Sequence, residues 1–125
     1  MTSPQSLSAY LKVLDEWIER AKMIKEWKDW SRKIADAAAD VLGDDVEVYV
    51  FGSAPRGEAI AASDVDILIV KEDVPPEKSK KLEIKLKVER KAGLPKTHPF
   101  EIHIVDREEA VTYINHIRES LIRIR

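Results

Sequence analysis

Apolar residues recur at steps of three and four positions through residues 3–42, a spacing that predicts an amphipathic helix. The pattern allows either one long helix or two helices with a bend near residues 22–25. Gly43 follows as the C-terminal stop. Three tryptophans lie on this segment, at positions 17, 27 and 30. We expect them to anchor the helix to the core, although an exposed tryptophan-rich surface would be a partner site.

Three later segments have the composition of strands. Residues 47–51 and 100–105 are short stretches rich in β-branched and aromatic side chains. Residues 64–70 contain an unbroken apolar run over their last four positions, which is typical of a strand covered on both faces. The sequence therefore predicts that these three strands belong to one sheet.

Two further helices are expected in the second half of the chain. Residues 77–92 alternate apolar and charged side chains as a strand would, but Pro75-Pro76 before them and Gly93-Leu94-Pro95 after them favour a helix. Asp106, with Glu109 three positions later, has the spacing of an N-terminal capping box. We expect the last helix to follow it and to occupy residues 107–125.

The resulting order, α-β-α-β-α-β-α, predicts an α+β protein with α/β-like alternation. We expect a small mixed sheet of three to four strands, flanked by helices and preceded by a long N-terminal helical extension. The 125 residues suit a single domain. It would consist of the extension (1–43), a core (46–106) and the C-terminal helix (107–125).

Charge adds a local feature that the near-neutral total of −2 conceals. Residues 36–73 carry two basic and ten acidic side chains, a net charge of −8, and residues 74–96 carry eight and three, a net charge of +5. A cation site beside a phosphate-attracting surface would have this pattern, and so would two ordinary solvated faces. The small total argues against strong nucleic-acid binding.

Other compositional features exclude several classes of protein. The chain has no cysteine, which excludes disulfides, thiolate metal sites and cysteine nucleophiles. It also lacks an apolar stretch long enough for a membrane span, and we expect a cytoplasmic protein. A charged fraction of 35%, with heavy use of Lys, Glu and Ile, is typical of thermophiles.

Candidate chemistry begins with two carboxylates, Asp64 and Asp66, placed two residues apart at the start of a strand. Side chains at this spacing project from one face of a sheet, where two carboxylates repel each other unless a cation lies between them. Oxygen ligands of this kind suit Mg²⁺. Glu101 would supply a third carboxylate if its strand is a neighbour. The alternative is a polar strand end that faces solvent.

A second candidate feature, Gly52-Ser53, lies where one strand ends and a loop begins. Backbone N–H groups at such a point are free to bind a phosphate, and glycine permits the close approach that this requires. Alone, the dipeptide is compatible with a plain turn. The combination of Gly-Ser, ten intervening residues and Asp-x-Asp is much less common by chance.

The segments Gly52-Ser53-Ala54-Pro55-Arg56-Gly57 and Ser63-Asp64-Val65-Asp66 together resemble the signature of the DNA polymerase β nucleotidyltransferase superfamily. More narrowly, they resemble its minimal nucleotidyltransferases, which are archaeal and bacterial proteins. The resemblance covers residues 46–106. It implies the nucleotidyltransferase fold and the transfer of a nucleoside monophosphate from an NTP to an acceptor hydroxyl, with loss of pyrophosphate.

Residue by residue, the resemblance implies that Gly52 and Ser53 hold the triphosphate. Asp64, Asp66 and Glu101 would be catalytic and would bind two Mg²⁺ ions. Glu101 departs from the Asp usual at the third position. Further nucleotide-binding candidates are Arg56 and Ser63. Two weaker candidates are Asp106, already explained as a helix cap, and His103, which shares a strand face with Glu101.

The resemblance also implies partners. Many minimal nucleotidyltransferases act as the antitoxin of a helical HEPN protein, and some adenylylate it. We therefore expect an ATP-dependent adenylyltransferase that modifies a macromolecule and forms a homo- or hetero-oligomer. The alternative is a non-catalytic antitoxin that neutralises a HEPN-type ribonuclease by binding it. The N-terminal helix and the C-terminal helix would then be the docking surfaces.

Overall fold

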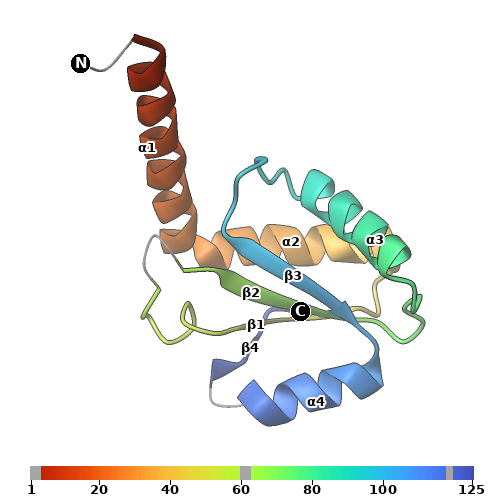
Figure 1. Cartoon of the computed structure of the whole chain (residues 1–125). Coiled ribbons are helices and arrows are strands. Elements are labelled where there is room, and N and C mark those ends of the chain that lie inside the picture. The colour runs from red at the N-terminus through yellow and green to blue at the C-terminus, as the bar shows by residue number, and fades with distance from the viewer. Residues whose placement is uncertain (1–3, 60–62, 118–119) are drawn as a thin grey trace.

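The N-terminal segment folds as two helices that meet at a sharp corner (Figure 1). A computed structural model describes residues 4–59, 63–117 and 120–125 of the chain. Helix α1 spans Pro4–Lys25 and α2 spans Trp27–Leu42, with Glu26 in a turn between them. The corner lets the last turn of α1, through Met23 and Ile24, bury side chains in the same core as α2. Of the two predicted alternatives, the bent one is therefore correct.

The predicted mixed sheet is present and has four strands in the order β3-β2-β1-β4. Strand β1 (Glu47–Phe51) pairs antiparallel with β2 (Val65–Val70), and β2 pairs parallel with β3 (Phe100–Val105). Strand β4 (Ile122–Arg123) pairs antiparallel with the other edge of β1. The apolar run of β2 lies between two strands, which explains why five of its six residues are buried.

The C-terminal helix is shorter than the sequence predicts. Helix α4 spans Arg107–Ile117, and β4 occupies part of the range 107–125 that we assigned to helix. The helical assignment beyond residue 117 is therefore wrong for β4. The chain end alternates Ile and Arg, a pattern that fits a strand, and its backbone groups pair with the edge of β1 that β2 leaves open.

The other two predictions for the second half of the chain are confirmed. Residues 78–91 form helix α3 (Lys78–Lys91), so the flanking proline and glycine signals outweigh the alternating pattern. The backbone N–H of Glu109 donates a hydrogen bond of 2.8 Å to Asp106 Oδ1. Asp106 is thus the N-cap of α4, which accounts for that carboxylate structurally.

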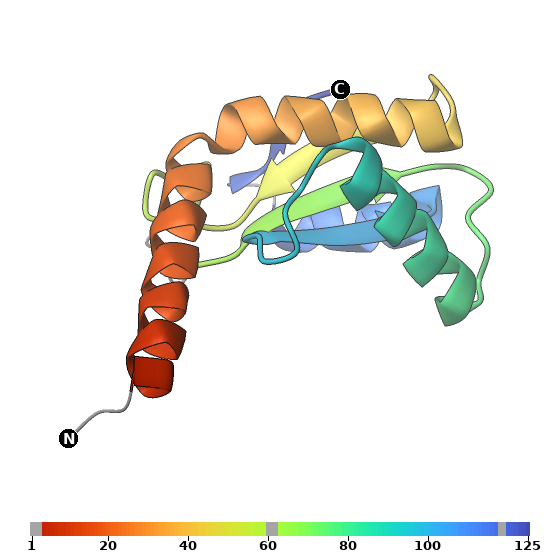
Figure 2. The same ribbon diagram turned by 90° about the horizontal axis from the view of Figure 1, so that it is seen from above.

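Helices cover both faces of the sheet, as Figure 2 shows. One face packs against α2 and α3 in a core that contains Val48, Val50, Ile67, Ile69, Ile102 and Ile104. The other face packs against α4 and contains Phe51, Leu68, Val70 and Val105. The side chains of Asp66, Glu101 and His103 belong to this second face by strand alternation, near the start of β2 and β3.

Helix α1 projects from the body, and its N-terminal end lies far from the sheet (Figures 1 and 2). From residue 6 to residue 22, every residue is exposed except Glu16 and Arg20, which are half-buried. Within the described part of the chain, no helix combines the length and apolar character that a bilayer span requires.

Candidate active site

Three potential metal ligands converge at the start of the parallel strands β2 and β3. The strand register places Asp66 beside Glu101 and Leu68 beside His103, so two carboxylates and an imidazole share one face. Ligand atoms of Asp66, Glu101 and His103 all lie within 4.8 Å of one another. The structure thus brings together the two carboxylates that the sequence could place near each other only if their strands were neighbours.

The imidazole of His103 is held in place by aromatic neighbours. Its ring centroid lies 5.8 Å from that of Phe51 and 5.7 Å from that of Tyr113, and the two flanking rings are themselves 6.2 Å apart. Contacts of this kind favour a fixed ring orientation. The Nε2 atom lies 3.4 Å from Asp66 Oδ1, which directs the ring towards the carboxylates.

Gly52 is packed directly against one of these carboxylates. Its φ is +92°, a conformation that other residues rarely adopt. A Cβ atom added at Gly52 would lie 2.8 Å from Asp66 Oδ2, closer than such atoms can approach. The glycine predicted to admit a phosphate is therefore also the residue that makes room for Asp66.

Ser53 and Arg56 lie in the tight turn that follows β1. The Ser53 carbonyl accepts hydrogen bonds from the backbone N–H groups of Arg56 (3.2 Å) and Glu58 (3.0 Å), which shape the loop. The Arg56 side chain is half exposed and lies 3.3 Å from the Glu58 carboxylate. Arg56 is therefore at the rim of the site, where an anion would find an accessible guanidinium.

Gly52, Arg56 and Asp66 line one cleft, which has a volume of about 690 Å³. Its volume lies within the range typical of sites for small ligands. One wall comes from the sheet and the loop after β1, and the other comes from the C-terminal part of α4. The lining residues are Phe51, Gly52, Arg56, Asp66, Asn115, His116, Ile117 and Ser120. Asn115 and His116 were not predicted, because the sequence shows only that they are polar positions within the expected last helix.

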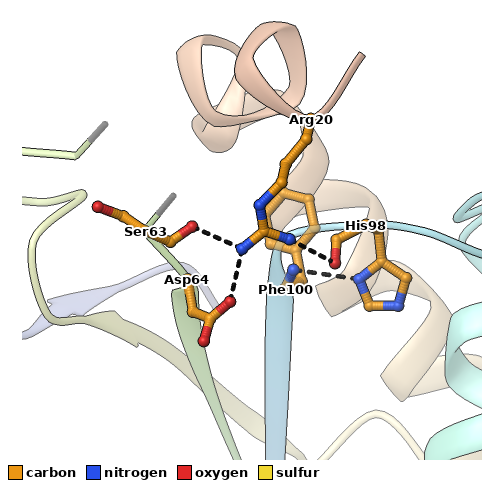
Figure 3. Close-up of polar contacts among 5 residues, drawn as sticks. All are labelled: Arg20, Ser63, Asp64, His98 and Phe100. Atoms are coloured by element: carbon orange, nitrogen blue, oxygen red, sulfur yellow. Dashed lines mark hydrogen bonds and ion pairs between the residues drawn. The ribbon is translucent and has the colours of Figure 1, made fainter. Parts of the chain in front are cut away.

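Asp64, the first carboxylate of the motif, has a different partner. Its Oδ1 atom lies 2.7 Å from Nη2 of Arg20, a residue of α1 (Figure 3). Among the described residues, the group of ligand atoms around Asp66 does not include this carboxylate. The Asp64 side chain is 54% exposed, whereas that of Arg20 is 18% exposed. Asp64 and Asp66 thus lie at the same strand end, but only Asp66 belongs to the cluster of potential metal ligands.

Arg20 also binds the backbone at the starts of both strands. It donates hydrogen bonds to the Ser63 carbonyl (2.9 Å) and to the His98 carbonyl (3.2 Å). Figure 3 shows the guanidinium between these groups and Asp64. No pattern in the sequence indicates this role, since Arg20 is one of several charged residues on α1. Ser63, predicted to bind nucleotide, is placed here by its carbonyl contact with Arg20.

His98, whose carbonyl accepts a hydrogen bond from Arg20, has an imidazole ring with a lowered pKa. Its Nδ1 atom accepts a hydrogen bond from the Phe100 N–H (3.1 Å), and its Nε2 atom lies 3.4 Å from Glu89 Oε1. Burial lowers the pKa of His98 from its usual 6.5, against the opposing effect of the Glu89 carboxylate, while the charges of Lys85 and Arg20 lower it further. The neutral ring keeps Nδ1 available as an acceptor.

The side chains of the cluster fit a divalent cation. Asp66 and Glu101 supply the carboxylate oxygens that Mg²⁺ prefers, and Asp64 lies two residues away on the same strand face. His103 adds a nitrogen, a ligand type better suited to transition metals. We therefore consider Asp66 and Glu101 sufficient for a hard cation, with His103 either as a ligand or as a hydrogen-bond partner of Asp66.

The fold and this strand-end carboxylate cluster define a class of nucleotide-transferring proteins, and comparison with known proteins agrees. The family model for the nucleotidyltransferase domain matches residues 31–124. A crystal structure described as a "putative nucleotidyltransferase" is 32% identical, with a TM-score of 0.55, and the match covers 72% of this chain and 91% of that one. The chain belongs to the nucleotidyltransferase domain family and resembles its minimal members.

A second solved structure supports the fold alone. It is described as a "putative nucleotidyltransferase from Sulfolobus solfataricus" and is 20% identical, with a TM-score of 0.52. The match covers 88% of this chain and 83% of that one. The search of curated proteins gave no significant match. Family membership makes the protein a transferase that acts on nucleoside triphosphates, in a family that generally uses a divalent metal.

Proposed function

We propose that the protein transfers AMP from ATP to a hydroxyl group of a macromolecular acceptor, with Mg²⁺ as cofactor. The observation that carries this proposal is that Asp66 and Gly52 line one cleft while the Glu101 carboxylate belongs to the cluster of ligand atoms around Asp66. This cleft is large enough for a nucleotide and opens beside the loop that bears Ser53 and Arg56.

In this proposal, different residues of the site bind the phosphates and the metal ions. The backbone at Gly52 and Ser53 binds the β- and γ-phosphates, and the accessible Arg56 guanidinium pairs with a phosphate oxygen. Asp66 and Glu101, joined by Asp64, hold two Mg²⁺ ions. When bound, these ions supply charge neutralisation for the triphosphate and the departing pyrophosphate.

Chemically, the acceptor oxygen bonds to the α-phosphorus as the bond to the bridging oxygen of pyrophosphate breaks. Glu101 would accept the hydroxyl proton, a role supported by its exposed carboxylate in the cluster around Asp66. The longer side chain of Glu, compared with the usual Asp, extends the carboxylate outward by about one methylene. Asn115 and His116 line the opposite wall, where they could hydrogen-bond the nucleoside.

We further propose that the acceptor is a HEPN-family protein and that the pair acts as a toxin and its antitoxin. The domain would comprise the core 46–106, preceded by the extension 1–43, with residues 107–125 closing the cleft. The experiment uses α-labelled ATP, Mg²⁺ and a HEPN protein encoded beside this chain.

We expect label to appear on the partner with the wild-type protein and to fall at least about a hundredfold with Asp66→Asn. The matched control is Asp73→Asn, an exposed carboxylate in the loop after β2, which should transfer label normally. Equal labelling by wild type and Asp66→Asn would refute the catalytic role of the cluster.

A second candidate function is favoured by one observation, the ion pair between Arg20 and Asp64. A predicted metal ligand that is neutralised by an arginine suits a site that has lost its chemistry. In this alternative the protein is a non-catalytic antitoxin that silences a HEPN-type ribonuclease by binding. Asp66→Asn would then still neutralise the partner, whereas the catalytic proposal requires that variant to fail.

A further inference from the structure

Helix α1 carries a broad apolar surface that the body of the protein does not cover. Six large side chains on one side of its first four turns are between 42% and 67% exposed: Leu7, Tyr10, Leu11, Leu14, Trp17 and Ile18. Val13, which lies farther round the helix, is 49% exposed. Among the side chains of α1 whose burial the structure describes, the buried apolar ones are Met23 and Ile24, both in the last turn. Exposed apolar surface of this extent, on a monomer of this size, marks an interaction site.

The spacing of these side chains is that of a helix-pairing seam. Leu7, Leu11, Leu14 and Ile18 are separated by steps of four, three and four, which places them along one line of the helix. Tyr10 and Trp17 are seven residues apart and therefore flank the same line on one side. The pattern predicts that the partner surface is itself an apolar helix.

The seam is also symmetric about its own middle. The pair Leu7 and Ile18 and the pair Leu11 and Leu14 are centred on the same point, between Lys12 and Val13. A two-fold axis through that point would place Leu7 of one chain beside Ile18 of the other, and Leu11 beside Leu14. It would also bring Tyr10 close to Trp17 of the other chain.

We propose that α1 pairs antiparallel with α1 of a second copy of this chain. The extent of the surface supports a second copy. Six large side chains, each about half exposed, present an area of the order of the roughly 800 Å² that one partner contributes to a standard interface. A helix pair that buries this area on both sides reaches the size of a stable dimer.

The shape of the molecule supports the antiparallel direction. The body is attached at the C-terminal end of α1, and the helix extends away from it (Figure 2). A helix of 22 residues is about 33 Å long, so antiparallel pairing places the two bodies at opposite ends of the seam. Parallel pairing would instead bring both bodies to the same end. The proposal does not depend on the catalytic one.

The first experiment measures the oligomeric state by sedimentation equilibrium. We expect the wild-type protein to have twice the chain mass and the double variant Leu11→Glu, Leu14→Glu to have the chain mass, with dimerisation weakened at least tenfold. Both side chains are exposed in the protomer, so the variant should fold, which circular dichroism can check. The control is Lys12→Glu, an exposed position on the opposite side of α1, which should leave the dimer intact.

The second experiment tests the direction by cysteine cross-linking, for which the cysteine-free chain is well suited. An equimolar mixture of Leu7→Cys and Ile18→Cys chains should form a mixed disulfide. Either variant alone should not, because equivalent positions in an antiparallel pair lie about 16 Å apart. Disulfides formed by each variant alone would show parallel pairing and overturn the proposal. A monomeric wild type would do so as well, and would leave the α1 surface to a different protein.

Discussion

At the scale of single residues, Gly52 matters both for the packing of the sheet and for the candidate site, because it lies against Asp66. The sequence identifies this glycine as a candidate for phosphate binding, but only the structure shows that Asp66 occupies the space where a side chain would be. The reason is that β1 and β2 are antiparallel neighbours, which places the end of one beside the start of the other.

Replacement of Gly52 by alanine tests this packing. The added Cβ would clash with Asp66 Oδ2, and the positive φ is itself unfavourable for alanine. We expect Gly52→Ala to lower the free energy of unfolding by about 1–2 kcal/mol and to weaken Mn²⁺ binding as Asp66 moves. The control is Gly57→Ala, because Gly57 also has a positive φ but has no atom near its added Cβ. Equal Mn²⁺ affinity in the two variants would contradict the account.

Arg20 offers a second test at this scale. Its guanidinium pairs with Asp64, so a cation that uses Asp64 must compete with it and is repelled by its charge. We expect Arg20→Gln to raise the affinity for Mn²⁺ several-fold, measured by calorimetry in the absence of nucleotide. A suitable control is Arg32→Gln, which removes an equal charge from the exposed face of α2. Weaker Mn²⁺ binding by Arg20→Gln would show instead that Arg20 positions the carboxylate.

At the scale of elements, the sequence predicts most of the fold because its signals are local. The capping pair at Asp106 and the glycine and proline that end α3 act within a few residues, and both were confirmed. Strand β4 was missed for the opposite reason. Its existence depends on the free edge of β1, which lies more than seventy residues earlier in the chain.

The junction between α3 and β3 carries the clearest pH dependence. The lowered pKa of His98 means that, just below pH 6.5, the unfolded chain binds more protons than the folded one. The contribution of His98 to stability is therefore complete above pH 6.5 and is lost as the pH falls. Protonation of Nδ1 would also break the hydrogen bond from the Phe100 N–H.

We expect the free energy of unfolding of the wild type to decrease between about pH 7.5 and about pH 5.5, and to decrease less in His98→Gln. Urea denaturation at several pH values measures both. Parallel curves for the two proteins would contradict this assignment, because the remaining carboxylates and histidines titrate in both.

At the scale of the whole molecule, the candidate site could be only partly predicted. Asp64, Asp66 and Gly52 are close in sequence, and the motif identifies them. Glu101 was a candidate only if its strand was a neighbour of the motif's strand, and the family resemblance also gave it the third position. The register of β2 and β3 now places it beside Asp66. Three residues that were not predicted come from helices at the two ends of the chain: Arg20, Asn115 and His116. Local sequence patterns do not predict contacts between residues so far apart in the chain.

The separation of charge along the chain also has a structural basis. The acidic segment, residues 36–73, contains Asp64 and Asp66. It also contains carboxylates outside the candidate site, such as Asp45, which forms an ion pair of 2.6 Å with Lys71. That contact holds the pKa of Asp45 below its usual value. The acidic character of the segment is thus shared between the candidate site and ordinary surface ion pairs.

We propose that the carboxylate cluster at the start of β2 and β3 binds a nucleoside triphosphate together with a divalent cation. The most direct measurement is calorimetric titration of ATP into the protein with and without Mg²⁺, for the wild type, Asp66→Asn and the control Asp73→Asn. We predict Mg²⁺-dependent binding that Asp66→Asn weakens at least tenfold and Asp73→Asn leaves unchanged. Binding that is equally tight in Asp66→Asn, or that is independent of Mg²⁺, would contradict the account.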